Sequence, residues 1–218
     1  MNALTREPDT VSTVVGKDAA LLSEMVCIAE FFWRFTMKKN QLRALCESAI
    51  LTAIAMVLSY LEIPIGMSFG GFGGSLSLVM IPIVICALRW GAGWGLGCGL
   101  VFGTLKFFFS NGWAMNWESM LLDYSLAYMV LGLAGFFRGR SKVAWLGAFV
   151  GCFGRFVIHF ISGVTIYAEY AGPIFGIDGG AFVYSVLYNG SYMLPNTILT
   201  VAAIALLQKP LEKFRTRG

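Results

Sequence analysis

The chain has 218 residues, of which 57% are hydrophobic and only 13% are charged, and its formal net charge is +4. Soluble domains carry about 25% charged residues, so a soluble fold of this composition would lack the polar side chains to cover its surface. The composition therefore predicts a polytopic membrane protein. The basic residues stand in short clusters between apolar runs, which is typical of membrane topology signals and indicates no nucleic-acid partner.

The first 36 residues differ from the rest of the chain. Residues 1–17 are polar and lack the basic start of a signal peptide. Residues 19–35 are apolar but contain three charged side chains, which is typical of a helix that lies on a membrane surface. The alternative is that translation begins at Met37. We therefore expect 1–36 to be an N-terminal extension that is either interfacial or not translated natively.

Six apolar segments follow, and a helix needs about 20 residues to cross a bilayer. The segments are expected at roughly 43–61, 77–92, 94–111, 118–137, 143–165 and 181–207. This pattern predicts an all-α membrane protein with six transmembrane helices in a compact bundle. The bundle would comprise residues 37–211, and residues 212–218 would form a basic cytoplasmic tail.

The positive charges predict the orientation of this bundle. Basic clusters occur at 38–43, Arg89, 138–142 and 209–217, all on one face of a six-span arrangement. By the positive-inside rule that face is cytoplasmic, so both termini are expected inside. The opposite, outer face carries mainly acidic residues in its loops, among them Glu62.

Small residues recur at a spacing of four on three predicted helices. They are Ala49 and Ala53 on the first, Gly95, Gly99 and Gly103 on the third, and Gly147 and Gly151 on the fifth. The glycines indicate close helix packing, because a phosphate-binding loop would end in Gly-Lys-Ser/Thr after a strand. The alanine pair has two interpretations, internal packing or a docking surface for a partner membrane helix.

A glycine-rich stretch, 66–75, connects the first two predicted helices on the outer side. One interpretation is a lid over an outward-facing site, and the other is a merely flexible loop.

Polar side chains lie inside the apolar segments near the outer face. At 1.5 Å per residue, Asp123 lies about 8 Å deep, His159 about 10 Å, Tyr184 about 5 Å and Asn189 about 12 Å. Each of them alone has a simpler interpretation as a helix–helix hydrogen bond or an interfacial aromatic. Because polar groups inside a membrane are costly, their common depth favours an outward-facing ligand pocket. Arg155 lies one turn further in, and the sequence identifies no partner for it.

The composition of this layer suits a flat heteroaromatic cation. A carboxylate supplies the opposite charge, and desolvated aromatic faces attract a cation by about 2 kcal/mol. A single histidine with no neighbouring nucleophile offers neither a catalytic triad nor a metal site, so we expect no enzyme and no bound cofactor or metal. The chain contains no ATP-binding motif, so energy must come from elsewhere or from a partner.

Four motifs occur in order along the chain. They are Ser75-Leu-Ser-Leu-Val-Met-Ile-Pro82, Leu122-Asp-Tyr-Ser-Leu-Ala127, His159-Phe-Ile-Ser-Gly163 and Tyr184-Ser-Val-Leu-Tyr-Asn-Gly190. In residues, order and spacing the chain resembles the thiamine-specific substrate-binding subunits, or S-components, of energy-coupling factor (ECF) vitamin transporters. The resemblance covers roughly 37–211.

The resemblance implies a multi-pass subunit of a bacterial plasma membrane that binds thiamine from outside. The positions that correspond to the family's ligand site are Phe102, Trp113, Asp123, Tyr124, His159, Gly163, Tyr167, Tyr184 and Asn189, with Ser77 where an acid is expected. Three further departures concern side-chain size. Asp123 is shorter than the glutamate that the family also uses, while Tyr167 and Gly172 stand at positions expected to hold tryptophan.

The resemblance also implies partners. A transmembrane coupling subunit and two ATP-binding subunits would supply the energy, using ATP, and Ala49 and Ala53 would form the docking face. The subunit is then expected to topple in the membrane as the lid opens.

The residues are also compatible with three other functions. These are an S-component for another heterocyclic vitamin or precursor, an autonomous ion-coupled transporter, and a membrane enzyme or scaffold. An ion-coupled carrier predicts inverted repeats or broken helices, which the sequence does not display.

Overall fold

A computed structural model describes residues 39–65, 74–109 and 114–215 of the chain. The predicted extension over 1–36, the greater part of the glycine-rich stretch and Trp113 lie outside the described residues. The chain divides into two compact units, and the architecture below is that of Arg43–Gly218.

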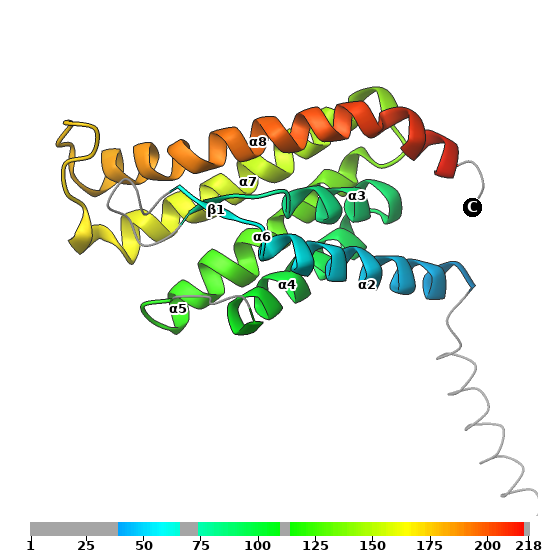
Figure 1. The fold of residues 1–218 in the computed structure, drawn as a ribbon, viewed down its shortest axis with the longest axis horizontal. Helices are drawn as coiled ribbons and strands as arrows, with labels where there is room; N and C mark the ends of the chain where they lie inside the picture. Colours follow the sequence, from blue (N-terminus) through cyan, green and yellow to red (C-terminus); the bar gives the residue numbers. More distant parts are fainter. Residues whose placement is uncertain (1–38, 66–73, 110–113, 216–218) are drawn as a thin grey trace, which may run out of the picture. The chain divides into compact units, whose positions relative to one another are not determined.

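Helices account for most of the described residues. In chain order they are α2 (Lys39–Ser59), α3 (Met80–Trp90), α4 (Ala92–Phe109), α5 (Trp117–Ser119), the π-helix η2 (Met120–Leu126), α6 (Ala127–Met129), the 3₁₀-helices η3 (Val130–Phe137) and η4 (Ser141–Val143), α7 (Ala144–Thr165), the 3₁₀-helix η5 (Ala168–Tyr170) and α8 (Gly180–Arg215). The elements from α5 to η3 follow one another without a break. Figure 1 shows the long helices running along one common direction.

Five described segments are long and apolar enough to cross a membrane. They are Asn40–Ser59, Ala92–Phe109, Trp117–Phe137, Ser141–Thr165 and Gly180–Lys209. These segments lie where five of the six transmembrane helices were predicted.

The predicted second span, 77–92, contains the shorter apolar helix α3, which has 11 residues. Such a helix is about 16 Å long, roughly half the thickness of a bilayer core. Gly91, with a φ of +97°, ends α3 and lets α4 begin one residue later. At the other end, the backbone N–H of Ser77 donates to Asn196 Oδ1 on α8 over 2.9 Å, which holds this residue outside the helix.

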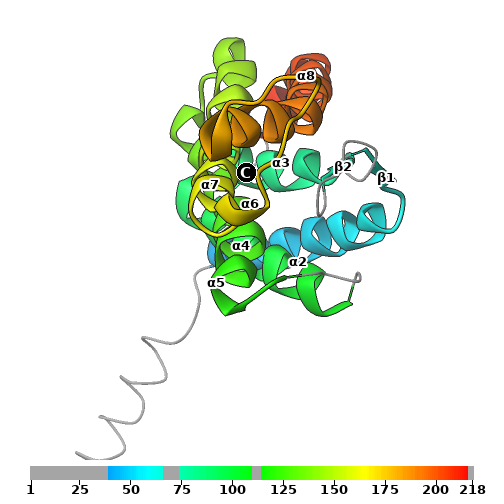
Figure 2. The ribbon, with the colours of Figure 1, turned by 90° about the vertical axis from the view of Figure 1, so that its left-hand side faces the viewer.

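α3 lies at the centre of the core. Met80, Ile83 and Val84 on this helix are completely buried, and α3 contacts α4, η3, α7 and α8. In Figure 2 it lies between α8 and α2. No residue of this short helix is exposed, which explains why its sequence is apolar on almost all sides, apart from Arg89 in the last turn, which pairs with Glu47.

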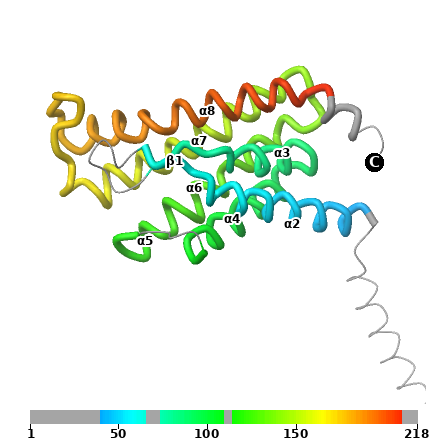
Figure 3. The backbone as a smooth tube through the Cα atoms, in the orientation of Figure 1, coloured from blue at the N-terminus to red at the C-terminus, as the bar shows by residue number. Residues whose placement is uncertain are grey.

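The connections gather at two ends. The tube in Figure 3 shows α5 and the turn between α7 and α8 at one end, and the connection between η3 and α7 at the other. The strands β1 (Ile63–Pro64) and β2 (Ser75–Leu76) form a short antiparallel hairpin between α2 and α3. Asn196 of α8 holds β2 in place by donating to the Ser75 carbonyl over 2.7 Å.

The glycine face of α4 packs against the backbone of the segment α5–η3, as predicted. A Cβ atom at Gly99 would collide with the carbonyl oxygen of Tyr128, and one at Gly103 with that of Tyr124. On α7, a Cβ at Gly151 would approach the Leu131 carbonyl oxygen to 2.8 Å. The glycines therefore let helices approach until backbone meets backbone, and this confirms their packing role.

We predict that Gly99→Ala destabilises the protein, whereas Gly97→Ala does not. A Cβ at Gly97 meets no described atom within 4 Å. The clash at Gly99 is with backbone and no rotamer change relieves it, so a loss of roughly 1–3 kcal/mol is expected. Thermal unfolding of both variants in detergent measures this, and equal midpoints would show that the close approach is not required.

Candidate ligand-binding site

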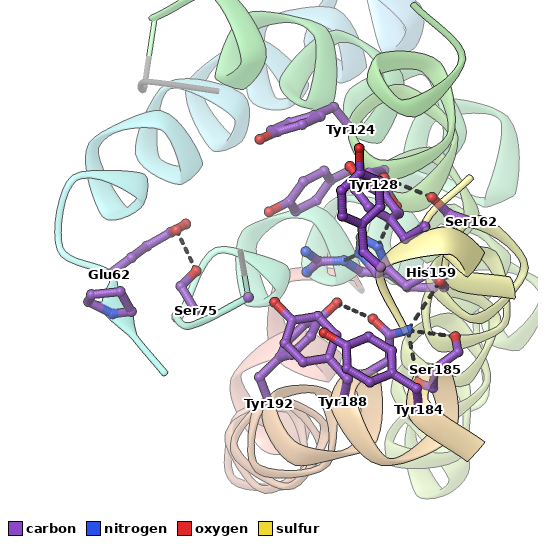
Figure 4. Close-up of a pocket in the computed structure, with 18 of the residues that line it drawn as sticks. Glu62, Ser75, Tyr124, Tyr128, His159, Ser162, Tyr184, Ser185, Tyr188 and Tyr192 are labelled. Atoms are coloured by element: carbon purple, nitrogen blue, oxygen red, sulfur yellow. Dashed lines mark hydrogen bonds and ion pairs between the residues drawn. The ribbon is translucent and has the colours of Figure 1, made fainter. Parts of the chain in front are cut away.

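The described residues line a cavity of about 360 Å³ beside the hairpin of β1 and β2. This volume is within the range of small-molecule sites, about 300–1,000 Å³. Seven of the chain's eight tyrosines line it, namely Tyr124, Tyr128, Tyr167, Tyr170, Tyr184, Tyr188 and Tyr192. Figure 4 shows the five tyrosine rings that it labels around a common space. The wall therefore offers aromatic faces with hydroxyl groups at their edges.

Asp123 projects from the π-helix η2 toward α7. Its Oδ1 lies 3.0 Å from His159 Nδ1, and its Oδ2 accepts from the hydroxyl groups of Ser162 over 2.8 Å and Ser119 over 3.2 Å. A π-turn holds one residue more than an α-turn and is frequent at functional sites. Here the same widened segment carries both Asp123 and Tyr124, which line the cavity.

Arg155 determines the protonation of the histidine. Its Nε donates to His159 Nε2 over 3.3 Å, and a guanidinium has only donors. Nε2 must therefore accept, so the proton of a neutral His159 ring is on Nδ1 and is donated to Asp123. The guanidinium carbon of Arg155 also lies 4.0 Å from the ring centroid of Tyr128, a cation–π contact. Within the described residues, Arg155 thus contacts an imidazole and an aromatic ring.

Asn189 connects α8 to α7. Its Nδ2 donates to the backbone oxygens of His159 and Ser185 over 3.2 and 3.0 Å, and its Oδ1 accepts from Tyr192 Oη over 2.7 Å. Gly163 permits this contact, because a Cβ there would collide with Ser185 Oγ. Asn189 therefore orients the tyrosines of α8 and the backbone that carries the histidine.

Two tyrosine contacts shape the cavity surface. Tyr184 and Tyr188 on α8 stack with centroids 5.6 Å apart and planes at 8°. Tyr167, just beyond α7, forms a hydrogen bond of 2.6 Å with Ser119 Oγ. Burial raises the pKa of the Tyr167 phenol, so it stays protonated at neutral pH and keeps its O–H donor.

A second charged group lies on the opposite side of the cavity. Lys106 of α4 forms an ion pair with Glu62, which follows α2, and Ser75 of the hairpin donates to the other Glu62 oxygen over 2.6 Å. The sequence predicts Glu62 in an outer loop and a single acid in the site. The cavity is instead lined by two acids, Glu62 and Asp123. The signal that could have found this pair is Lys106, a lone charge in an apolar helix.

The structure brings most of the predicted residues together, but not all. Asp123, Tyr124, His159, Gly163, Tyr167, Tyr184 and Asn189 line the cavity. Phe102 does not line it; it is completely buried on the core face of α4, with its ring 4.7 Å from that of Tyr128. Ser77 is also absent from the wall, since its backbone is bonded to α8. The cavity is also lined by four residues that the sequence did not predict for the site, namely Tyr128, Ser162, Ser185 and Tyr192.

Comparison with known proteins identifies the family. Residues 45–216 match the family described as thiamine transporter protein (Thia_YuaJ). The chain belongs to this family. It is 33% identical over 184 residues to thiamine transporter ThiT of Bacillus subtilis, an alignment that covers 78% of this chain and 92% of that protein. It is 31% identical over 184 residues to ThiT of Lacticaseibacillus paracasei, covering 77% and 88%.

A solved structure supports the fold. ThiT from Listeria monocytogenes superposes with a TM-score of 0.70 at 28% identity, covering 80% of this chain and 98% of that one. The resemblance to thiamine-specific S-components is therefore confirmed. As a thiamine transporter family member with five apolar helices of spanning length among its described residues, the chain is a multi-pass protein of the bacterial plasma membrane.

Proposed function

We propose that this chain is the high-affinity thiamine-binding subunit of an ECF-type uptake transporter. In this proposal it crosses the membrane six times, with α3 as the short second span and both termini in the cytoplasm. The cavity then opens toward the outside and captures thiamine there. The observation that carries the proposal is a carboxylate, Asp123, held inside a ring of tyrosines in a chain of the thiamine transporter family.

The two acids of the cavity differ in the charge that they leave available. Glu62 is paired with the ammonium of Lys106. Asp123 accepts from a neutral imidazole and two hydroxyl groups, so no cation in the described part of the chain neutralises it directly. The thiazolium ring of thiamine carries a positive charge, and Asp123 is the acid that can serve as its counter-charge. The stacked rings of Tyr184 and Tyr188 add aromatic faces, which attract a cation at low dielectric.

The remaining predicted site residues have supporting roles in this proposal. His159 orients Asp123, and Gly163 and Asn189 hold α7 against α8. Tyr124 and Tyr167 complete the aromatic wall around the vitamin.

Transport requires an energy source outside this chain. We propose that the chain has no cofactor or enzymatic activity and docks on a transmembrane coupling subunit whose two ATP-binding partners use ATP. Ala49 and Ala53 are exposed on α2, and the neighbouring Ile50 is 59% exposed. A small-residue surface of this kind on a spanning helix allows a second helix to approach closely.

Calorimetric titration of the purified chain with thiamine tests the ligand. Binding is expected in the unmodified protein, and Asp123→Asn is expected to weaken it at least tenfold, because a hydrogen-bonded charge interaction contributes about 1.5–3 kcal/mol. Glu169→Gln is the control, since it removes the same charge from an exposed side chain outside the cavity. Absence of thiamine binding by folded protein would overturn the proposed ligand.

We predict that Ala53→Trp leaves thiamine binding intact and abolishes most uptake. A large ring on the exposed α2 surface would keep a partner helix from approaching, while the cavity lies elsewhere. Leu206→Trp on α8, at a side chain that is 82% exposed, is the matched control and should preserve uptake. The measurement is labelled-thiamine uptake by cells that contain the coupling and ATP-binding subunits. Normal uptake by the Ala53 variant would exclude this surface as the docking face.

A further inference from the structure

Lys106 is a cation buried in the wall of the cavity. Its side chain is 10% exposed and that of its partner Glu62 is 15% exposed. The ammonium also lies 5.7 Å from the ring centroid of Tyr128, so it is held between a carboxylate and an aromatic face. An ion pair buried to this degree costs desolvation energy, and its presence in a lipid-embedded helix calls for a reason beyond packing.

The cluster of Lys106, Glu62 and Ser75 has hydrogen-bond donors left over for a ligand in the cavity. Both oxygens of Glu62 are occupied, one by Lys106 and the other by Ser75. An ammonium has three N–H donors, and Glu62 is the one acceptor that the described structure provides for it. The donors of Lys106 that remain can serve a ligand. The group that fits here is therefore an acceptor oxygen.

The position of the cluster suits one part of the ligand. In Figure 4, Glu62 and Ser75 lie on one side of the cavity, and His159, Ser162 and Ser185 lie on the other. A ligand whose charged ring is near Asp123 extends toward Lys106 with whatever substituent it carries at its far end. The thiazolium ring of thiamine carries an aminopyrimidinylmethyl group and a flexible hydroxyethyl chain, and the hydroxyethyl chain is the one that ends in an acceptor oxygen.

Resting on the proposed function, we infer that Lys106 recognises the hydroxyl oxygen of the ligand's tail and that Glu62 makes the site selective for the unphosphorylated tail. Glu62 neutralises Lys106, so the pair presents a donor without a net positive charge. A neutral hydroxyl needs only that donor. A phosphate ester would place one or two negative charges beside the Glu62 carboxylate, where the low dielectric strengthens their repulsion.

Binding constants for three ligands test this inference. The ligands are thiamine, thiamine monophosphate and an analogue with ethyl in place of hydroxyethyl. The unmodified protein is expected to bind thiamine at least tenfold more tightly than either of the others. Equal affinity for thiamine and the ethyl analogue would overturn the inference, whatever the variants do. No binding of thiamine at all would instead overturn the proposed function.

Variants then separate the two roles. The charge-balanced double variant Lys106→Met with Glu62→Gln is expected to bind thiamine no better than the ethyl analogue. Retained binding of the ethyl analogue shows that this variant is folded. Lys142→Met, an exposed lysine outside the cavity, is the control and should keep the preference for thiamine. A double variant that keeps the full preference would contradict the role of Lys106.

Glu62→Gln alone tests the selectivity. It leaves the ammonium without a counter-ion, so the ratio of affinities for thiamine and thiamine monophosphate is expected to fall at least tenfold. An unchanged ratio would show that Glu62 does not determine the selectivity against phosphate.

Discussion

The Asp123 carboxylate, held by neutral donors inside the helical bundle, is the group on which the rest of the site depends. A buried carboxylate requires hydrogen bonds, and the described structure supplies three, from the Ser119 and Ser162 hydroxyl groups and the His159 imidazole. Arg155 sets the tautomer of the histidine. By donating to His159 Nε2 it keeps the ring neutral, with its proton on Nδ1 facing Asp123. The carboxylate is thereby held in place but keeps its negative charge, so a cationic ligand can pair with it.

Helix packing and the site are built on the same backbone. The glycine face of α4 presses on the carbonyl groups of Tyr124 and Tyr128, whose side chains line the cavity. Three residues beyond Gly103, the same helix carries Lys106 into the wall of the cavity. Close approach of α4 to the α5–η3 segment therefore brings the ammonium near the aromatic ring of Tyr128. A looser contact between these helices would separate the charged groups that define the cavity.

The separation of charge within the cavity is consistent with a ligand that is charged at one end and neutral at the other. On one side an acid keeps its charge available, and on the other an acid and a base neutralise each other. Such an arrangement distinguishes ligands by the position of their charge as well as by its sign. The net charge of the cavity could not select a cation, because the formal charges of Asp123, Glu62, Lys106 and Arg155 sum to zero around a neutral His159.

The sequence by itself determined the features that depend on periodicity and composition. Apolar length located the five helices of spanning length among the described residues. A glycine at every fourth residue located the contact surface of α4, and depth along each helix placed Asp123, His159, Tyr184 and Asn189 in one layer. The four motifs also led to the family, which the comparisons confirm. These properties follow from the rise and turn of a single helix, so they can be read without knowing its neighbours.

Only the tertiary structure decided which side chains share a wall. Glu62 and Lys106 are 44 residues apart and meet because the end of α2 lies beside α4. Phe102 and Ser77 have suitable positions along the chain, yet one faces the core and the other is bonded to α8. Depth along a helix says nothing about the direction in which a side chain points around it. That direction is set by how the helices pack, and packing joins residues that are distant in sequence.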